Sequence, residues 1–271
     1  MPLVSIGDCE LQVWSEGDGA PLLLVAGLGG RGAFWDPHIQ TLAEHFRVVT
    51  HDQRGTGGSS RWVGRYSVSR LANDVLQLMD ALEIARADFV GHSTGGAIGQ
   101  HIALHAPDRL RSLVLSGTWC GPDSTFLRTF ELRRKVLEDC SAREYYALGA
   151  LLAFPPAWIA KHPETLGRKL SDTELWYPGL EIETARLEAV MKHDLRDRVG
   201  GITTPTFVLG AGDDQLTPEH FQRELADRIG GTRLHVFPKG GHFFPRTRPD
   251  EFCDCVLSFL GVPGHDADPP G

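Results

Sequence analysis

The sequence predicts an α/β fold with a mostly parallel β-sheet flanked by helices, and three observations lead to this prediction. Short apolar runs alternate with stretches of helical periodicity, and the connections between them are short. This alternation is interrupted once, at residues 119–198, and then resumes. Because alternating strands and helices place successive strands parallel and cover both faces of the sheet, one large domain with a single insertion accounts for the chain.

The expected strands are continuous apolar runs, which are typical of parallel strands covered on both faces. They are 22–26, 47–51, 87–91, 113–116, 206–209 and 234–237. The expected helices are 35–45, 68–82, the segment after Gly96 through 106, 219–229 and 249–260. We therefore expect a core of 1–118 and 199–262, a helical insertion of 119–198 and a loose tail of 263–271.

Composition excludes several classes of function. The formal net charge of −8 argues against nucleic-acid binding, which needs a basic surface. No run approaches the roughly 18 apolar residues of a membrane span, and the first residues lack the features of a signal peptide, so we expect a cytoplasmic protein with no membrane contact. The odd, scattered cysteines predict buried free thiols and no metal site: Cys9, Cys120, Cys140, Cys253 and Cys255.

The most informative motif is Gly91-His92-Ser93-Thr94-Gly95, which fits the pattern G-x-S-x-G. The bare pattern arises by chance and also describes an ordinary structural turn. Here it follows an expected strand and precedes an expected helix, which is the context of a nucleophilic serine on a sharp turn. Glycine at both ends leaves room for the strained backbone of such a turn. Ser93 is therefore the candidate nucleophile.

A serine hydroxyl needs a neighbouring base, so a histidine is expected downstream. His242 follows Pro238-Lys239-Gly240-Gly241, a flexible turn after the last strand, and is the candidate general base and acid. The other downstream histidines fall on a helix, within a strand and in the tail, where packing or solvated roles are more natural: His220, His235 and His265.

The imidazole in turn needs a carboxylate that fixes its tautomer, and in this arrangement the chain order is serine, acid, histidine. Asp213 and Asp214 both follow the strand 206–209. We prefer Asp214 because it precedes Pro218 by four residues, and Asp213 is the alternative. The aspartate that is not used is expected to cap the following turn.

Hydrolysis of an acyl group also needs hydrogen-bond donors for the developing oxyanion. The backbone amide of Thr94 is one candidate, and the amide of Leu28, in the loop Gly27-Leu28-Gly29-Gly30, is the other. A phosphate-binding role is the rival interpretation of these glycines. The loop lacks the lysine of a P-loop and the full dinucleotide fingerprint, which favours the oxyanion role.

Together these motifs resemble the α/β-hydrolase superfamily along nearly the whole chain. Residues 26–30 with Phe34-Trp35, and Asp52-Gln53-Arg54-Gly55-Thr56-Gly57, are similar to the aminoacrylate hydrolases of pyrimidine breakdown and to 3-oxoadipate enol-lactonases. Many relatives have histidine before the oxyanion glycine, whereas this chain has Ala26, so the side-chain hydrogen bond that supports the loop there is expected to be missing.

The resemblance implies that the insertion 119–198 is a helical cap, which covers the serine and selects the substrate. Candidate substrate contacts are Gly27, Trp119, Phe126, Phe130, Trp158 and Trp176, although packing within the cap explains most of these aromatics equally well. Arg133, Arg134 and Lys135 form a basic run. This run is either a solvated helix face or a partner for a substrate carboxylate.

The resulting hypothesis is a serine-dependent hydrolase, without cofactor or metal, of a small ester, lactone, enol-lactone or enamine-type metabolite. An acyl-enzyme and an activated-water mechanism both fit the residues. Alternatives on the same fold are a small-molecule receptor, a carbon–carbon bond hydrolase and a cofactor-free perhydrolase. The partner expected is the small-molecule substrate, and the oligomeric state stays open, with a homodimer as the default expectation.

Overall fold

The computed structural model describes residues 2–164, 167 and 173–265, which include an eight-stranded sheet of order β1-β2-β4-β3-β5-β6-β7-β8. The strands are β1 (Leu3–Ser5), β2 (Glu10–Glu16), β3 (Ala20–Val25), β4 (Phe46–His51), β5 (Ala87–His92), β6 (Leu110–Ser116), β7 (Thr206–Ala211) and β8 (Arg233–Phe237). All neighbours from β4 to β8 pair in parallel, which confirms the predicted mostly parallel sheet.

The strands β1 and β2 were not predicted from the sequence. They pair antiparallel with each other, and β2 pairs antiparallel with β4, so they extend one edge of the sheet. Leu11 and Val13 of β2 are buried, whereas the residues that follow each of them, Gln12 and Trp14, are partly exposed. This alternation is typical of an antiparallel strand with one solvated face, and it lacks the continuous apolar run that marks the parallel strands.

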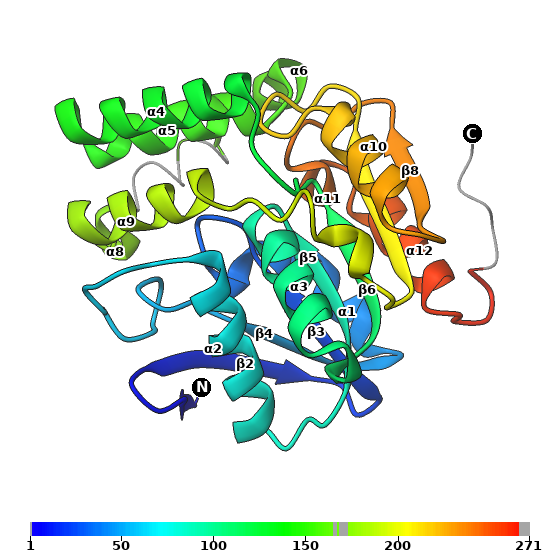
Figure 1. Ribbon diagram of the computed structural model, residues 1–271. Helices are drawn as coiled ribbons and strands as arrows, with labels where there is room; N and C mark the ends of the chain where they lie inside the picture. Colours follow the sequence, from blue (N-terminus) through cyan, green and yellow to red (C-terminus); the bar gives the residue numbers. More distant parts are fainter. Residues whose placement is uncertain (1, 165–166, 168–172, 266–271) are drawn as a thin grey trace.

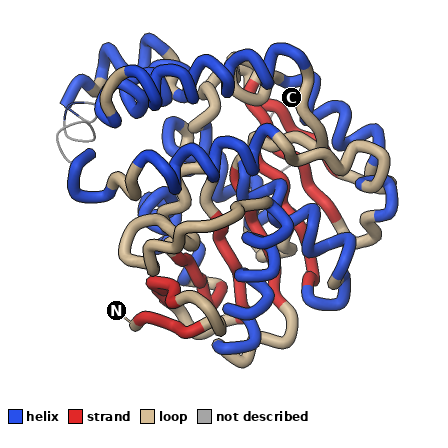
Figure 2. The backbone as a smooth tube through the Cα atoms, turned by 60° about the vertical axis from the view of Figure 1, so that its left-hand side comes forward, coloured by secondary structure: helices blue, strands red, loops and turns tan. Residues whose placement is uncertain are grey.

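Helices cover both faces of the sheet, as Figure 2 shows with red strands between blue helices. They are α1 (Asp36–Ala43), α2 (Val68–Ala81), α3 (Thr94–His105), α10 (Glu219–Arg228), α11 (Phe244–Thr247) and α12 (Pro249–Phe259), with short 3₁₀ turns at Gly32–Trp35, Pro107–Arg109 and Val199–Gly201. Alternate residues of β3 point to opposite faces: Leu23 packs in the cluster that contains α2 and α3, and Leu24 in the cluster that contains α1 and α12. Each central strand is thus buried on both faces, as its apolar run predicts.

The chain between β6 and β7 is helical, as expected for 119–198. The described helices there are α4 (Ser124–Asp139), α5 (Ala142–Ala153), α6 (Pro156–Lys161), α8 (Thr173–Trp176) and α9 (Leu180–Met191). The Asp123 side chain caps α4 by accepting from the Phe126 amide at 2.7 Å, and Ser141 and Glu144 cap α5 reciprocally. Figure 1 shows these helices gathered beyond one end of the sheet. The division into core and cap stays a prediction, and most of the expected tail, 266–271, lies outside the described residues.

The cysteines are free, and four of the five are buried. The expectation of burial is wrong for Cys140, which is exposed at the carboxyl end of α4. In the described part of the chain, no group of histidine, cysteine, aspartate and glutamate side chains has an arrangement that would hold a metal ion. None of the described helices is both long and apolar enough to cross a membrane.

Candidate active site

The candidate residues lie at the edge of the sheet formed by the carboxyl ends of the parallel strands, in loops that follow four of these strands. The loop 27–30 follows β3, Ser93 follows β5, Asp214 follows β7 and His242 follows β8. Because parallel strands all end at the same edge, residues far apart in the sequence meet there. This edge is also where open α/β sheets generally bind their ligands.

Ser93 occupies a strained turn between β5 and α3. Its φ of 55° and ψ of −118° lie where non-glycine residues are rare. The turn is held by two contacts with the end of β6: the Ser93 amide donates to Ser116 O at 2.8 Å, and Thr118 Oγ1 donates to Ser93 O at 2.7 Å. A β-carbon at Gly95 would collide with the Val25 carbonyl oxygen, so this position of the motif requires glycine.

Asp214 contacts His242, as preferred from the sequence. Its Oδ2 lies 2.8 Å from Nδ1 of His242, and both side chains are buried. The same carboxyl group accepts from the amides of Leu216 and Thr217 and from the Thr217 hydroxyl, at 2.8–2.9 Å. Because a carboxylate only accepts, this contact places the imidazole proton on Nδ1 and leaves Nε2 as a proton acceptor. Thr217 was not identified from the sequence, although it lies in the same loop.

Asp213 has a different position from the one expected. Its Oδ1 accepts from the amides of Gly240 and Gly241, at 2.8 and 2.7 Å, so it binds the turn before His242 and not the turn after itself. At Gly241, φ is 65°, and a β-carbon would lie 2.6 Å from the Ala153 carbonyl oxygen. Adjacent aspartates thus share the work: one contacts the imidazole and the other fixes the loop that carries it.

This arrangement predicts a graded effect at Asp213. Replacing it by alanine removes the acceptor for both glycine amides and lets the loop of His242 drift, so we expect kcat/KM to fall about 10- to 100-fold, the range of a misplacement near 1 Å. Asp213→Asn keeps an acceptor oxygen and should retain most of the activity. Steady-state kinetics of both variants tests this, and an alanine variant with wild-type kcat/KM would contradict it.

The imidazole of His92 packs against that of His242. Its ring centroid lies 4.8 Å from that of His242 and it stacks on Phe34. Desolvation lowers the pKa of His92 well below its usual range, and the neighbouring His242 lowers it further, so His92 is neutral at physiological pH. Among the described residues, Ser93 Oγ and His242 make no direct hydrogen bond. Such catalytic contacts often tighten only when substrate binds.

The two expected oxyanion donors belong to the start of α3 and to the loop that follows β3. Thr94 begins α3, where the first amides have no partner within the helix. The loop 27–30 turns tightly, with the Gly30 amide donating to Gly27 O at 2.9 Å. Gln53 Nε2 donates to the Ala26 carbonyl at 2.7 Å and so supports the loop from beneath. The sequence analysis gives Gln53 no role of its own, although it lies in the segment 52–57 that resembles known hydrolases.

Comparison with known proteins decides the family. The α/β-hydrolase fold model matches residues 20–249. This chain belongs to that family. It is 35% identical to a protein of Azorhizobium caulinodans named "Putative carbamate hydrolase RutD", over 96% of this chain and 98% of that one. Among solved structures, an enol-lactonase of Burkholderia xenovorans LB400 has a TM-score of 0.87 at 29% identity, covering 96% of this chain and 99% of that one. A hydrolase of Pseudomonas aeruginosa PA01 has a TM-score of 0.85 at 33% identity, covering 94% and 95%.

These relatives confirm the resemblance seen in the motifs at both levels. The family match extends over the strands that carry Ser93, Asp214 and His242. The narrower resemblance that the segments 26–35 and 52–57 suggested also agrees with these relatives, a protein named carbamate hydrolase RutD and an enol-lactonase.

The aromatic residues expected to line the pocket of this α/β hydrolase divide into two groups. Trp119, Phe126 and Phe130 are buried and pack in series, with ring centroids 4.8 and 4.4 Å apart. Phe126 also contacts Phe221 of α10, at 5.9 Å. Within the described residues, none of these three rings contacts His92 or His242. Packing of the helical insertion against the core accounts for this first group.

The second group lies nearer the candidate site. Trp158 stacks on Phe154 at 4.4 Å, Phe154 contacts Phe243 at 5.0 Å, and Phe243 follows His242. The insertion also reaches this loop through its backbone, since the Phe243 amide donates to Ala153 O at 3.0 Å. Trp158 therefore belongs to an apolar wall beside the imidazole.

Trp176 and Gly27 are the remaining candidates for substrate contact. The guanidinium of Arg31 lies 5.6 Å from the Trp176 ring, just beyond the loop 27–30. Gly27 lies beside the serine: a β-carbon there would be 3.0 Å from Ser93 Cβ and 3.5 Å from Ser93 Oγ. The absence of a side chain at Gly27 thus keeps the space next to the hydroxyl open.

The basic run on α4 has two fates. Lys135 is exposed and Arg134 is partly exposed, and they pair with Asp139 and Glu138 one turn later, as expected for a solvated helix face. Arg133 is buried, with Nη2 3.3 Å from the Tyr145 hydroxyl. The solvated interpretation therefore holds for two of the three residues, and the third packs inside the helical insertion.

Proposed function

We propose that the chain is a serine-dependent hydrolase of small acyl compounds, with Ser93 as nucleophile, His242 as base and acid, and Asp214 as the partner that orients His242. The observation that carries this proposal is the 2.8 Å contact between Asp214 Oδ2 and His242 Nδ1 at the sheet edge where the strained turn displays Ser93. A hydrogen-bonded carboxylate and imidazole next to an otherwise unreactive hydroxyl is the arrangement that activates serine.

In the proposed reaction, Nε2 of His242 takes the Ser93 proton as Oγ adds to the substrate carbonyl carbon. The amides of Leu28 and Thr94 donate to the resulting oxyanion. His242 then passes the proton to the leaving oxygen or nitrogen, and the carbon–heteroatom bond breaks to leave an acyl-enzyme. Water, deprotonated by His242, cleaves this ester, and the proton returns to Ser93. Every group required belongs to the chain itself.

The proposed substrates of this route are small compounds with a carbonyl carbon bonded to oxygen or nitrogen: esters, lactones, enol-lactones and carbamates. An enamine-type acid has no such carbonyl carbon, so its hydrolysis would use the activated-water route. Two relatives carry names in this range, a carbamate hydrolase and an enol-lactonase. The wall formed by Phe34, Phe243 and Trp158 beside the two histidines favours a compact acyl group over a long chain.

A substrate series tests this proposal. We expect repeated turnover of p-nitrophenyl acetate, of an enol-lactone or of a phenyl carbamate, with kcat/KM falling at least about tenfold from acetate to octanoate because binding a longer chain requires displacement of the aromatic wall. Initial rates with each compound provide the measurement, and Ser69→Ala, an exposed serine on α2, is the control variant. A single turnover followed by arrest would favour a ligand receptor and overturn the proposal.

A further inference from the structure

Arg186 connects the helical insertion to the loop that carries one proposed oxyanion donor. It lies on α9 and is only 1% exposed. Its Nη2 and Nε donate to the Leu28 carbonyl at 2.8 and 3.2 Å. The same guanidinium donates to the Arg54 carbonyl at 3.1 Å and to Gln53 Oε1 at 2.7 Å. A buried arginine whose N–H groups bind backbone carbonyl groups of another segment holds that segment in place, and we call this arrangement a clamp.

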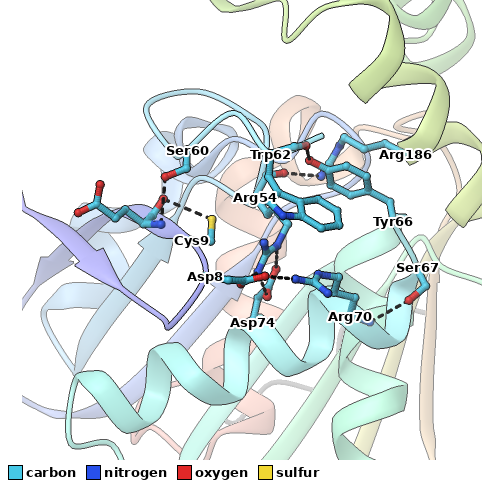
Figure 3. Close-up of polar contacts among 11 residues, drawn as sticks. Asp8, Cys9, Arg54, Ser60, Trp62, Tyr66, Ser67, Arg70, Asp74 and Arg186 are labelled. Carbon is cyan, nitrogen blue, oxygen red and sulfur yellow. Dashed lines mark hydrogen bonds and ion pairs between the residues drawn. The ribbon is translucent and has the colours of Figure 1, made fainter. Parts of the chain in front are cut away.

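The Arg54 carbonyl, which Arg186 also binds, belongs to a residue whose side chain is held by several contacts. The Arg54 guanidinium is buried and binds both carboxyl oxygens of Asp74, at 2.9 and 2.7 Å, and also Asp8 at 2.8 Å. The Trp62 ring lies 4.9 Å from the Arg54 guanidinium and 4.3 Å from that of Arg70. Figure 3 shows this cluster on one side of the Arg186 side chain. Arg186 is thus fixed at one side by a network that does not include the candidate site.

Toward the candidate site, Arg186 and Gln53 bind the loop 27–30 and the residue before it at two carbonyl groups, those of Leu28 and Ala26. Gln53 joins them, because its Nε2 donates to the Ala26 carbonyl while its Oε1 accepts from Arg186. The carbonyl groups on either side of Gly27 are therefore held by one connected pair of side chains. The backbone amide of Gln53 also donates to Gly30 O at 2.7 Å, which fixes the far end of the loop.

We propose that Arg186 is a positioning residue for the oxyanion site. This inference rests on the proposed function. By holding the Leu28 carbonyl, the guanidinium fixes the peptide plane that follows Leu28 and so limits rotation of the Leu28 amide. Preorganised donors stabilise the transition state because they need no rearrangement during the reaction. A residue of the helical insertion thus completes the support of a loop whose preceding position, Ala26, offers no side-chain donor. Correct seating of α9 and oxyanion stabilisation are coupled.

The test compares Arg186→Met and Arg186→Lys with Arg196→Met. Arg196 is a matched control, since it donates to the Gly121 and Pro122 carbonyl groups beside the same insertion but has no contact with the loop 27–30. For each protein, kcat and KM are measured with p-nitrophenyl acetate, and hydrogen exchange is followed by mass spectrometry in peptides that cover 26–31 and 119–123. Exchange reports on the clamp whether or not the protein turns over this ester.

We expect Arg186→Met to lower kcat about 100-fold, the scale of losing one oxyanion donor, with KM changed less than about threefold. Exchange at 26–31 should accelerate at least about tenfold while 119–123 is unchanged. Arg186→Lys keeps a positively charged donor group but loses the planar fork of the guanidinium, so it should recover part of both losses. It also serves as the informative variant if Arg186→Met does not fold. Arg196→Met should have wild-type kcat and exchange at 26–31.

Wild-type exchange at 26–31 in both Arg186 variants would overturn the inference, as would wild-type kcat in Arg186→Met. A rise in KM with unchanged kcat would also overturn it, because it would make Arg186 a contributor to ground-state binding. Failure of the proposed function looks different: the wild-type protein itself would show no turnover that depends on Ser93, while exchange at 26–31 would still decide whether Arg186 holds the loop.

Discussion

Replacing Ser93 by alanine is expected to lower kcat/KM by about 10⁵-fold or more while the fold is preserved. The hydroxyl is the only group proposed to bond to substrate, and removal of the nucleophile in comparable triads costs about 10⁶-fold in kcat. Both routes considered for this chain, acyl-enzyme and water activation, use this hydroxyl. The loss should therefore appear with every substrate of the series, and steady-state rates measure it.

Stability separates this result from simple unfolding. Ser93 has a positive φ, which costs of order 1–3 kcal/mol for a non-glycine residue, and alanine carries the same strain as serine. The melting temperature of Ser93→Ala should thus match that of the wild-type protein. Ser69→Ala, on the exposed side of α2, should match it in both stability and activity. If Ser93→Ala retained turnover within about tenfold of wild type, serine catalysis would be excluded.

Asp214→Asn is expected to lower kcat about 10⁴-fold, the second largest effect. The asparagine oxygen can still accept from the amides of Leu216 and Thr217, which turns the amide nitrogen toward His242. An N–H group facing Nδ1 favours the wrong imidazole tautomer, with the proton on Nε2, and His242 then cannot take the Ser93 proton. The side chain keeps its size, so KM and stability should change little.

The neighbouring aspartate provides the control. Asp213→Asn alters the same dipeptide but leaves an acceptor for Gly240 and Gly241, so its activity should lie within about tenfold of wild type. Measuring kcat for the two asparagine variants side by side tests the assignment directly. If Asp213→Asn were the more damaging substitution, the acid role would pass to Asp213.

The sequence predicted the central sheet because its parallel strands are continuous apolar runs, and 22–26 or 206–209 need no tertiary information to be recognised. It also indicated the order of the candidate groups, since a glycine-flanked serine between strand and helix and a histidine after a glycine turn have local signatures. The choice of Asp214 over Asp213 agrees with the contact in the structure. The strands β1 and β2 were missed because β1 has only three residues and because β2 alternates buried and exposed residues and so lacks a continuous apolar run.

Arg186 and Thr217 could not be assigned from the sequence for a physical reason. Arg186 is 158 positions from Leu28, whose carbonyl it binds, and no local pattern in α9 marks it as different from Arg133 or Arg134. The contacts of Arg186 with Leu28 and Gln53 make the difference, and these contacts depend on how the insertion packs on the core. Thr217 lies near Asp214 in the sequence, yet its hydroxyl is a clamp only because the loop folds back on the carboxylate.

The central claim is that Ser93 is an activated nucleophile, and covalent labelling tests it most directly. The protein is incubated with a small fluorophosphonate, and the modified residue is located by peptide mass spectrometry. The account predicts one phosphonyl group per chain, on Ser93, and labelling slowed by at least about 100-fold in Asp214→Asn, because its His242 no longer removes the serine proton. Unmodified Ser93 in a folded wild-type protein, or equal labelling of Ser69, would contradict it.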